Sequence, residues 1–156
     1  MQSMASFVSQ NVGAGKHKRA KQSMFTGMGV GLAVGCLVFC LVFLQGDTLS
    51  GFFTTDTAVI ARAYDYLKGF APETLGTAIL FSMMGYFNGN NKTVFVMAQG
   101  MIQTLLVRLP LSYYMSIQPD ASLTRIGLAA PISTAVGIVL CIGCYLYMQR
   151  GEKKAQ

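Results

Sequence analysis

Four runs of sequence without a charged residue constrain the fold more than any other feature. They cover residues 22–46, 74–91, 93–107 and 126–149. A helix that crosses the hydrocarbon core of a bilayer needs about 20 mainly apolar residues. The first and last runs are long enough alone, and the middle two are long enough with their flanks. Because barrel strands would alternate at every second residue, the sequence predicts an all-α polytopic membrane protein with four transmembrane helices.

The composition agrees with a surface that lies largely in lipid. Hydrophobic residues make up 53% of the 156 residues and charged residues 12%, whereas a soluble domain carries roughly 25% charged residues. The mean hydropathy is +0.47. The first apolar run is too long for the core of a secretory signal, which has roughly 7–15 residues, so we interpret it as a membrane span.

Local signals divide the chain into segments. Asp56 or Thr55 is a suitable N-cap for a helix, and Pro72 is expected to kink or break that helix. Residues 1–11 are too short to cross a bilayer and are interpreted as the end of a helix that begins outside the chain. We expect a cytoplasmic loop at 12–21, span one at 22–45, an outer amphipathic helix and span two at 56–88, span three at 93–117, span four at 126–148 and a cytoplasmic tail at 149–156.

The basic residues predict the orientation, because lysine and arginine favour the cytoplasmic side of a membrane. With four spans, eight basic residues fall on the side of the two tails and three on the opposite side. Both tails are therefore predicted to be cytoplasmic, in a multi-pass protein of the cell (plasma) membrane. The eight are Lys16, Lys18, Arg19, Lys21, Lys92, Arg150, Lys153 and Lys154, and the three are Arg62, Lys68 and Arg125.

The glycines and basic residues of GAGKHKRAK do not form a known phosphate or nucleic-acid motif. Gly13 and Gly15 are two residues apart, which is not the spacing of the phosphate-binding loop G-x-x-x-x-G-K-[ST]. His17 has no nearby partner that would make it a metal ligand or a base. A nucleic-acid-binding protein gathers basic and aromatic residues on a folded face, which four spans do not provide. We predict neither nucleic-acid binding nor enzymatic activity.

The cysteines form two pairs, Cys36/Cys40 and Cys141/Cys144, each on one helix face. The second pair has the C-x-x-C spacing that can ligate zinc or act in redox chemistry. Spans one and four run in opposite directions, so the two pairs are expected at different depths in the bilayer. We interpret the cysteines as packing residues and predict no metal site and no cofactor.

Span one carries Gly27, Gly31 and Gly35 at intervals of four residues. Glycines at this spacing line one helix face and allow another helix to approach closely, which is a main source of helix association in lipid. The alternative is that transmembrane helices are rich in glycine in general. We take the three glycines as a predicted helix-packing face.

Glu73 is the acidic residue that lies in or beside a span interior. Ionisable side chains at membrane depth are costly and usually face a cavity or a partner, which makes Glu73 a candidate for handling a cation or a proton. Its position directly after Pro72 also suits hydration at the outer interface. Arg108 in span three either extends to the lipid headgroups or faces the bundle and pairs with Glu73 or a substrate.

Several other side chains are candidates for a substrate cavity. Thr77 and Phe81 follow Glu73 at helical spacing, and Gln99 and Gln103 are one turn apart in span three. A cavity of aromatic and amide groups suits bulky amphiphilic cations of varied shape, while ordinary helix packing is the alternative for each residue. The candidate cavity residues are Phe81, Gln99, Gln103 and Arg108.

Five segments together resemble the C-terminal lobe of the MATE (multidrug and toxic compound extrusion) transporters. In order they are SFVSQNVGAGKHKRAK, the glycine-rich span, FFTTDTAVIARAYDYLKGFAPE, GYFNGNNKT and VRLPLSYYM. The resemblance implies a twelve-helix exporter of two six-helix lobes, of which this chain holds the end of helix eight and helices nine to twelve. It also implies drugs or toxic compounds as substrates, protons or sodium ions as the coupling ion, and membrane lipid and a missing N-terminal lobe as partners.

The family's functional residues carry over only in part. In several members an acidic residue of helix ten takes part in cation coupling, about eight residues before the glycine that is Gly85 here, and the matching position is Thr77. Glu73 lies one turn earlier on the same face and is the candidate to replace it. The alternatives to multidrug efflux are a non-transporting fragment or helix-packing subunit, and a lipid-linked oligosaccharide flippase of a related fold.

Overall fold

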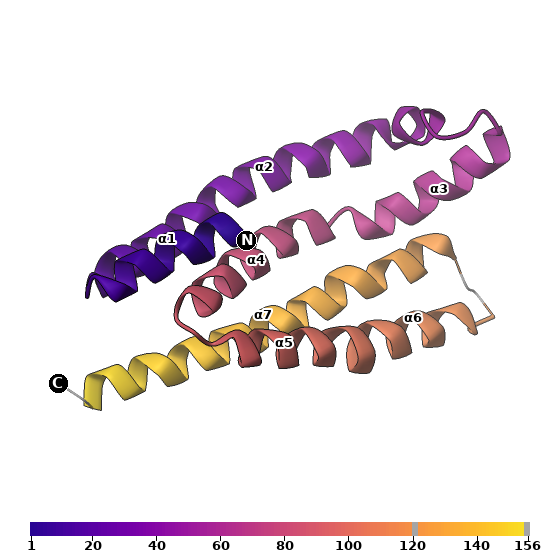
Figure 1. The fold of residues 1–156 in the computed structure, drawn as a ribbon. Coiled ribbons are helices and arrows are strands. Elements are labelled where there is room, and N and C mark those ends of the chain that lie inside the picture. Colours follow the sequence, from indigo (N-terminus) through magenta and orange to yellow (C-terminus); the bar gives the residue numbers. More distant parts are fainter. Residues whose placement is uncertain (120–121, 155–156) are drawn as a thin grey trace.

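The computed structural model describes residues 1–119 and 122–154, with side chains up to residue 150. Within this part of the chain the regular structure is entirely helical (Figure 1). A π-helical segment, η1, interrupts the helix formed by α5 and α6. The elements are α1 (Gln2–Gly13), α2 (His17–Gly51), α3 (Thr57–Phe70), α4 (Glu73–Gly89), α5 (Thr93–Met101), η1 (Ile102–Arg108), α6 (Leu109–Ser116) and α7 (Leu123–Lys154).

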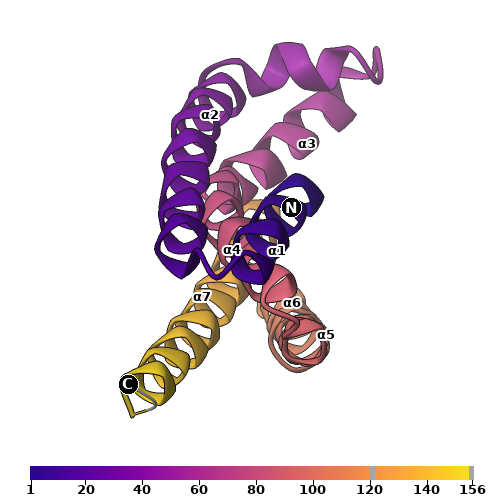
Figure 2. The ribbon, with the colours of Figure 1, turned by 60° about the vertical axis from the view of Figure 1, so that its left-hand side comes forward.

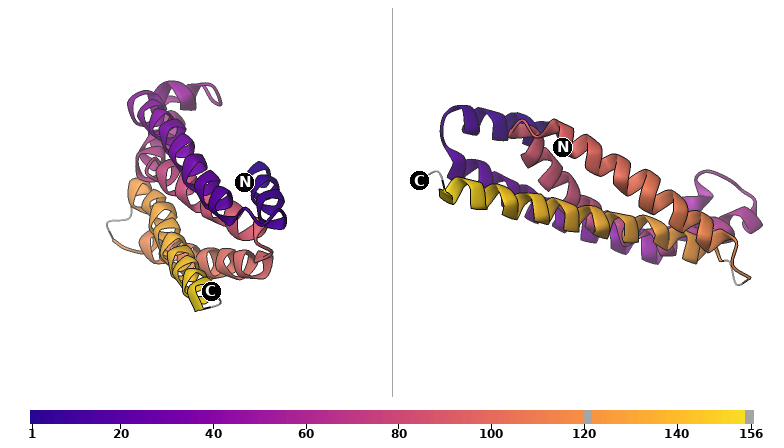
Figure 3. Two further views of the ribbon diagram at one scale, coloured as in Figure 1. Left: turned by 90° about the vertical axis from the view of Figure 1, so that its left-hand side faces the viewer. Right: turned by 90° about the horizontal axis from the view of Figure 1, so that it is seen from below.

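The helices run back and forth along one long axis. Helix α2 is followed by the antiparallel α3 and α4, then by α5–η1–α6 in the first direction and by α7 in the second (Figure 1). Figure 2 shows α4 near the centre, with α2 on its left, α1 on its right, and α5 and α7 below. The right-hand view of Figure 3 places the α1–α2 turn and the C-terminal end of α7 at the same end of the molecule.

Three helical segments of the described chain are long and apolar enough to cross a membrane. They are His17–Gly51, Thr93–Ser116 and Leu123–Arg150, and they cover the predicted spans one and four and all but the last residue of span three. The predicted second span is divided between α3 and α4, and α4 has 17 residues. The all-helical, membrane-spanning fold class is thus confirmed, whereas helix length alone does not establish a fourth crossing.

The outward faces of these long helices are apolar. Val30 and Leu44 of α2 are 62% and 76% exposed, Leu106 of η1 is 70% exposed and Val139 of α7 is 67% exposed. Extensive apolar surface of this kind marks contact with a membrane or another protein. Since the same helices have the length and composition of spans, lipid is the medium that their outer faces contact.

The loop that we expected at residues 12–21 is much shorter. Helix α1 continues to Gly13 and α2 begins at His17, so residues 17–21 form the first turns of α2. The connection is compact because Gly15 adopts a φ of +71°, which glycine tolerates without steric cost. At its far end α2 is kinked at Gln45 (φ −128°, ψ 27°), the residue where span one was predicted to end.

The start of α3 is held by Asp56. Its Oδ1 accepts hydrogen bonds from the backbone N–H groups of Ala58 at 2.9 Å and Val59 at 3.4 Å, so of the two expected caps Asp56 is the one used. Pro72 then separates α3 from α4, as predicted. A proline cannot donate the backbone hydrogen bond that would continue the helix.

The π-helical segment was not predicted. It precedes Pro110, which lies in the first turn of α6. Pro110 has no N–H to donate to the carbonyl of Leu106, and its ring crowds that carbonyl in a regular α-helix. Wider turns are one of the ways in which a helix accommodates such a position.

Small residues allow α4 to approach α2 closely. A Cβ atom added to Gly31 would lie 3.3 Å from the Cβ of Ala78, and one added to Gly35 would lie 3.0 Å from the carbonyl oxygen of Thr74. The Thr74 hydroxyl donates to the Ala71 carbonyl oxygen at 2.9 Å and also lies 3.3 Å from the Gly35 carbonyl oxygen. Gly27 faces Met4 of α1. The three glycines of α2 therefore lie along its contacts with α1 and α4.

A second close approach joins α3 to the start of α7. A Cβ atom at Gly69 would overlap the carbonyl oxygen of Thr124, and one at Gly127 would lie 2.6 Å from the carbonyl oxygen of Tyr66. The Thr124 hydroxyl donates to the Asp65 carbonyl at 2.8 Å. The two backbones can be this close only because both positions lack a side chain.

We predict that Gly69→Ala destabilises the protein, because the clash is with backbone atoms that cannot rotate away. The expected cost is about 1–3 kcal/mol, seen as a lower midpoint of thermal unfolding in detergent. Gly29→Ala is the matched control, because no atom lies within 4 Å of its added Cβ. Equal unfolding midpoints for the two variants would contradict the close α3–α7 contact.

Candidate functional site

A cleft of about 780 Å³ lies between α2 and α4, with the start of α1 at its edge. Helix α4 contributes Glu73, Thr77 and Phe81, which are spaced by four residues and so share one helix face. Helix α2 contributes the glycine face opposite. The full lining is Met1, Ser3, Met4, Gly27, Gly31, Val34, Gly35, Val38, Phe70, Glu73, Thr74, Thr77, Ala78, Phe81 and Ser82.

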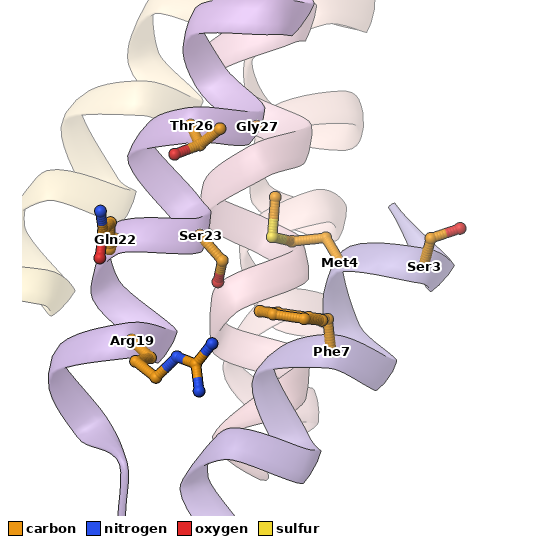
Figure 4. A pocket seen from close by; sticks show the side chains of 8 residues that line it. All are labelled: Ser3, Met4, Phe7, Arg19, Gln22, Ser23, Thr26 and Gly27. Carbon is orange, nitrogen blue, oxygen red and sulfur yellow. The ribbon is translucent and has the colours of Figure 1, made fainter.

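A second cleft of about 530 Å³ adjoins the first between α1 and the beginning of α2 (Figure 4). The two clefts share Ser3, Met4 and Gly27. In Figure 4, Phe7 of α1 and Arg19 of α2 extend toward one another across the gap between their helices. Together the clefts form a groove with α2 on one side and with α1 and α4 on the other.

The groove has one formal charge of each sign among its lining side chains. Glu73 lies in the cleft against α4 and Arg19 in the cleft against α1. The rest of the lining consists of apolar, hydroxyl and amide groups. Mainly apolar pockets with a few polar groups are the usual form of small-molecule sites, and a carboxylate at one end favours a positively charged ligand there.

On the side away from the cleft, Glu73 joins a chain of side-chain hydrogen bonds that runs between the helices. The Thr134 hydroxyl of α7 donates to Glu73 Oε1 at 2.9 Å. Gln103 Nε2 of η1 donates to the Thr134 oxygen at 3.1 Å, and Gln99 Nε2 of α5 donates to Gln103 Oε1 at 2.7 Å. Four side chains from α4, α7 and α5–η1 are thus connected in series.

Both ends of this chain have an unused acceptor. Glu73 Oε2 and Gln99 Oε1 are buried and have no hydrogen-bond partner in the described structure. Gln99 is 1% exposed and Thr134 is 1% exposed. Leaving a buried polar atom unpaired costs roughly 1–3 kcal/mol. The unpaired carboxylate oxygen belongs to a side chain that lines the cleft.

Two glycines make room for the chain. A Cβ atom at Gly137 would lie 2.5 Å from Gln103 Oε1 and 2.7 Å from Gln99 Nε2, and one at Gly76 would lie 2.8 Å from the methyl group of Thr134. The two amides therefore pack directly on the backbone of α7. Thr134 likewise packs on the backbone of α4.

The structure separates the predicted site residues into two groups. Glu73, Thr77 and Phe81 line the cleft, with Phe81 49% exposed. Gln99 and Gln103, predicted as cavity residues, do not line it and instead belong to the interior chain that ends at Glu73. Sequence reasoning missed Thr134, Gly76 and Gly137. A hydroxyl and a glycine three residues apart in span four were the available signal.

Arg108 belongs to neither group. It is half-buried at the end of η1 and does not line the cleft. The ion pair that the structure describes joins Lys68 and Asp65 on α3, at 3.6 Å. The suggested pairing of Arg108 with Glu73 is therefore not formed in this conformation.

The cysteines differ in their surroundings. Cys141 is buried in the core, Cys144 is half-buried, and Cys36 and Cys40 are exposed. All four are free thiols. Within the described residues, no group of three or more histidine, cysteine, aspartate or glutamate side chains is arranged to hold a metal ion.

Comparison with known protein families identifies one that covers most of the chain. The MatE family model matches residues 1–114, which extends from α1 into α6. No curated protein and no solved structure matches the chain significantly. The match covers well over half of the 156 residues. The chain therefore belongs to the MatE family, the MATE transporters.

Proposed function

We propose that the protein takes part in secondary active multidrug efflux, exporting amphiphilic or cationic compounds in exchange for protons or sodium ions. Members of the family are transporters. The groove supports the proposal by its chemistry, because it combines apolar and aromatic surface with a single carboxylate. Phe81 presents an exposed ring within one cleft and Glu73 the charge that would attract a cation.

Glu73 carries the proposal. Its carboxyl group lies at the cleft, one oxygen accepts a hydrogen bond from Thr134, and the other is buried without a partner. A carboxylate in this position binds either the drug or the coupling ion more tightly when the other is absent. Competition of that kind for one carboxylate exchanges one cation for another. Thr77, one turn along the same face, contributes a hydroxyl oxygen to the same cleft.

We propose that the protein lies in the plasma membrane and crosses it four times. The end of α3 and α4 form the second crossing, and both tails lie in the cytoplasm. The distribution of basic residues supports this orientation. The end of the molecule with the α1–α2 turn and the end of α7 carries Lys16, Lys18, Arg19, Lys21 and Arg150. Excess lysine and arginine favours the cytoplasmic side.

A second lobe is part of the proposal. Secondary transporters generally alternate their access by moving one repeat against another. We therefore propose that this chain works with an N-terminal lobe in a twelve-helix MATE fold. The groove between α2 and α4 would then open and close by movement of the two lobes. A helix-packing subunit without transport would use the Gly27, Gly31 and Gly35 face alone, and an oligosaccharide flippase would be expected to carry more charge in its cavity.

We predict that Glu73→Gln abolishes coupled transport. The measurement is uptake of ethidium, an amphiphilic cation, into liposomes that hold the chain together with its N-terminal lobe, with a proton or a sodium gradient imposed in turn. The expected loss in the rate of uptake is at least about tenfold, which corresponds to roughly 1.4 kcal/mol in the barrier. Asp65→Asn is the matched control, since Asp65 is an exposed acid that pairs with Lys68 on α3.

The outcomes separate the alternatives. Uptake by the Glu73→Gln protein at the level of the unaltered protein would remove Glu73 from the mechanism. Gradient-independent ethidium levels in the unaltered protein would instead favour the non-transporting subunit. The gradient that supports uptake identifies the coupling ion.

We predict opposite accessibility for the two ends of the bundle. In a variant whose four cysteines are replaced, Thr55→Cys should react with a membrane-impermeant maleimide added to intact cells. Lys18→Cys should react only after the membrane is permeabilised. Thr55 and Lys18 are both exposed in the structure, so the membrane alone limits the access of the reagent. The reverse pattern would show that the tails face outward.

A further inference from the structure

The charge at Glu73 dictates the direction of every hydrogen bond in the interior chain. An ionised carboxylate can only accept hydrogen bonds, so the Thr134 hydroxyl must donate to it. The Thr134 oxygen then accepts from Gln103 Nε2, and Gln103 Oε1 accepts from Gln99 Nε2. With Glu73 ionised, the far end of the chain at Gln99 is therefore an acceptor oxygen, and this is the atom that is buried without a partner.

Protonation of Glu73 reverses the chain with no movement of its heavy atoms other than a half-turn of the two amide groups. The added proton is best placed on Oε1, because Oε2 has no neighbouring acceptor. The carboxyl group then donates to the Thr134 oxygen, and the Thr134 hydroxyl donates to Gln103. Each amide can present its oxygen or its nitrogen by rotating through 180°. Gln103 then donates to the oxygen of Gln99, whose buried free end becomes an N–H group.

The far end of the chain lies on a helix segment suited to change. Gln103 is part of η1, and Gln99 lies in the last turn of α5 just before it. π-Helical turns are rare and are found mostly at functional sites. Both amides pack on the backbone of α7 at Gly137. An N–H group at the buried end of Gln99 can donate to a backbone carbonyl oxygen of α5 or η1, which the amide oxygen in its place cannot do.

We propose that Thr134, Gln103 and Gln99 form a relay through which the charge of Glu73 sets the stability of the π-helical segment Ile102–Arg108. The relay rests on the proposed role of Glu73 as the coupling residue and adds a path from that residue to α5–α6. Thr134 and Gln103 are positioning residues, because they act through Glu73 and contact no substrate. The segment that responds is also the one that ends at Arg108.

No other charged side chain of the cleft competes for this role. The residues of α1 and α2 that line the cleft with Glu73 carry uncharged side chains. On the neighbouring helices, Lys68 of α3 pairs with Asp65, Arg108 ends η1, and Arg125 lies nine residues before Thr134, roughly 13 Å along α7 at helical rise. The described ion pairs do not include Glu73.

Hydrogen exchange of the full chain in lipid nanodiscs tests the relay. Backbone protection of residues 102–108 is measured across pH, corrected for intrinsic chemical exchange with α2 as the internal reference. We expect protection to change by about 5- to 150-fold as Glu73 is neutralised, the range of a typical coupling between sites. Glu73→Gln should remove the dependence of this protection on pH, because a glutamine amide has no charge that changes with pH.

Variants of Thr134 distinguish a relay from simple packing. Thr134→Val keeps the size and the methyl group beside Gly76 but removes the hydroxyl, so the pH response of residues 102–108 should be lost. Thr134→Ser keeps the hydroxyl and should retain the response. Ser133→Ala is the matched control, because the Ser133 hydroxyl bonds to the Ala130 carbonyl within α7. Gln103→Met serves as a second break in the chain if the valine variant does not fold.

Two results overturn the relay. One is protection of residues 102–108 that is independent of pH in the unaltered protein, and the other is an unchanged pH response in Thr134→Val or Gln103→Met. Neither depends on transport. Loss of ethidium uptake in Glu73→Gln, together with protection of residues 102–108 that is independent of pH in the unaltered protein, would support the proposed function and refute the relay. A pH response of residues 102–108 that depends on Glu73, without any ethidium uptake, would support the relay and refute the proposed function.

Discussion

Helix α4 is packed closely on two sides at once, and the arrangement of the other helices depends on this. Gly31 and Gly35 allow it to lie against α2, while Gly76 allows Thr134 of α7 to lie against its opposite side. In a bilayer, where apolar residues gain little by leaving lipid, such close van der Waals contact and interhelical hydrogen bonds hold helices together. The first turn of α4 carries Glu73, so the acidic side chain is placed between the cleft and the interior chain by the same packing.

Much of the fold follows from local sequence signals. Charge-free runs located the three long helices, Asp56 marked the start of α3, and Pro72 marked its separation from α4. These features depend on residues next to one another in the chain. The π-helical segment could not be anticipated, because several backbone responses can accommodate Pro110 and the choice among them depends on packing against α7. The α1–α2 turn is shorter than predicted because both helices continue beyond their apolar residues, α1 to Gly13 and α2 from His17.

The site was only half accessible to sequence reasoning. The spacing of Glu73, Thr77 and Phe81 placed them on one face, because helical periodicity relates residues on a single element. Gln99 and Gln103 were recognised as polar residues within a span, but their partner is on α7, outside the segment matched by the family model. A hydrogen bond between residues 31 positions apart leaves no periodic signal. Its assignment required the crossing geometry of α5–η1 and α7.

The contact between Gly137 and the two amides has an evolutionary consequence. A side chain at position 137 and the glutamine amide at position 103 would occupy the same volume, so a larger residue at 137 requires the amide at 103 to move or to be replaced. Among homologous chains these two positions should substitute together, with alanine or serine at 137 accompanied by a shorter residue at 103. A correlated pair of this kind would reveal the interior chain from an alignment even where the acidic residue of α4 has moved by a turn.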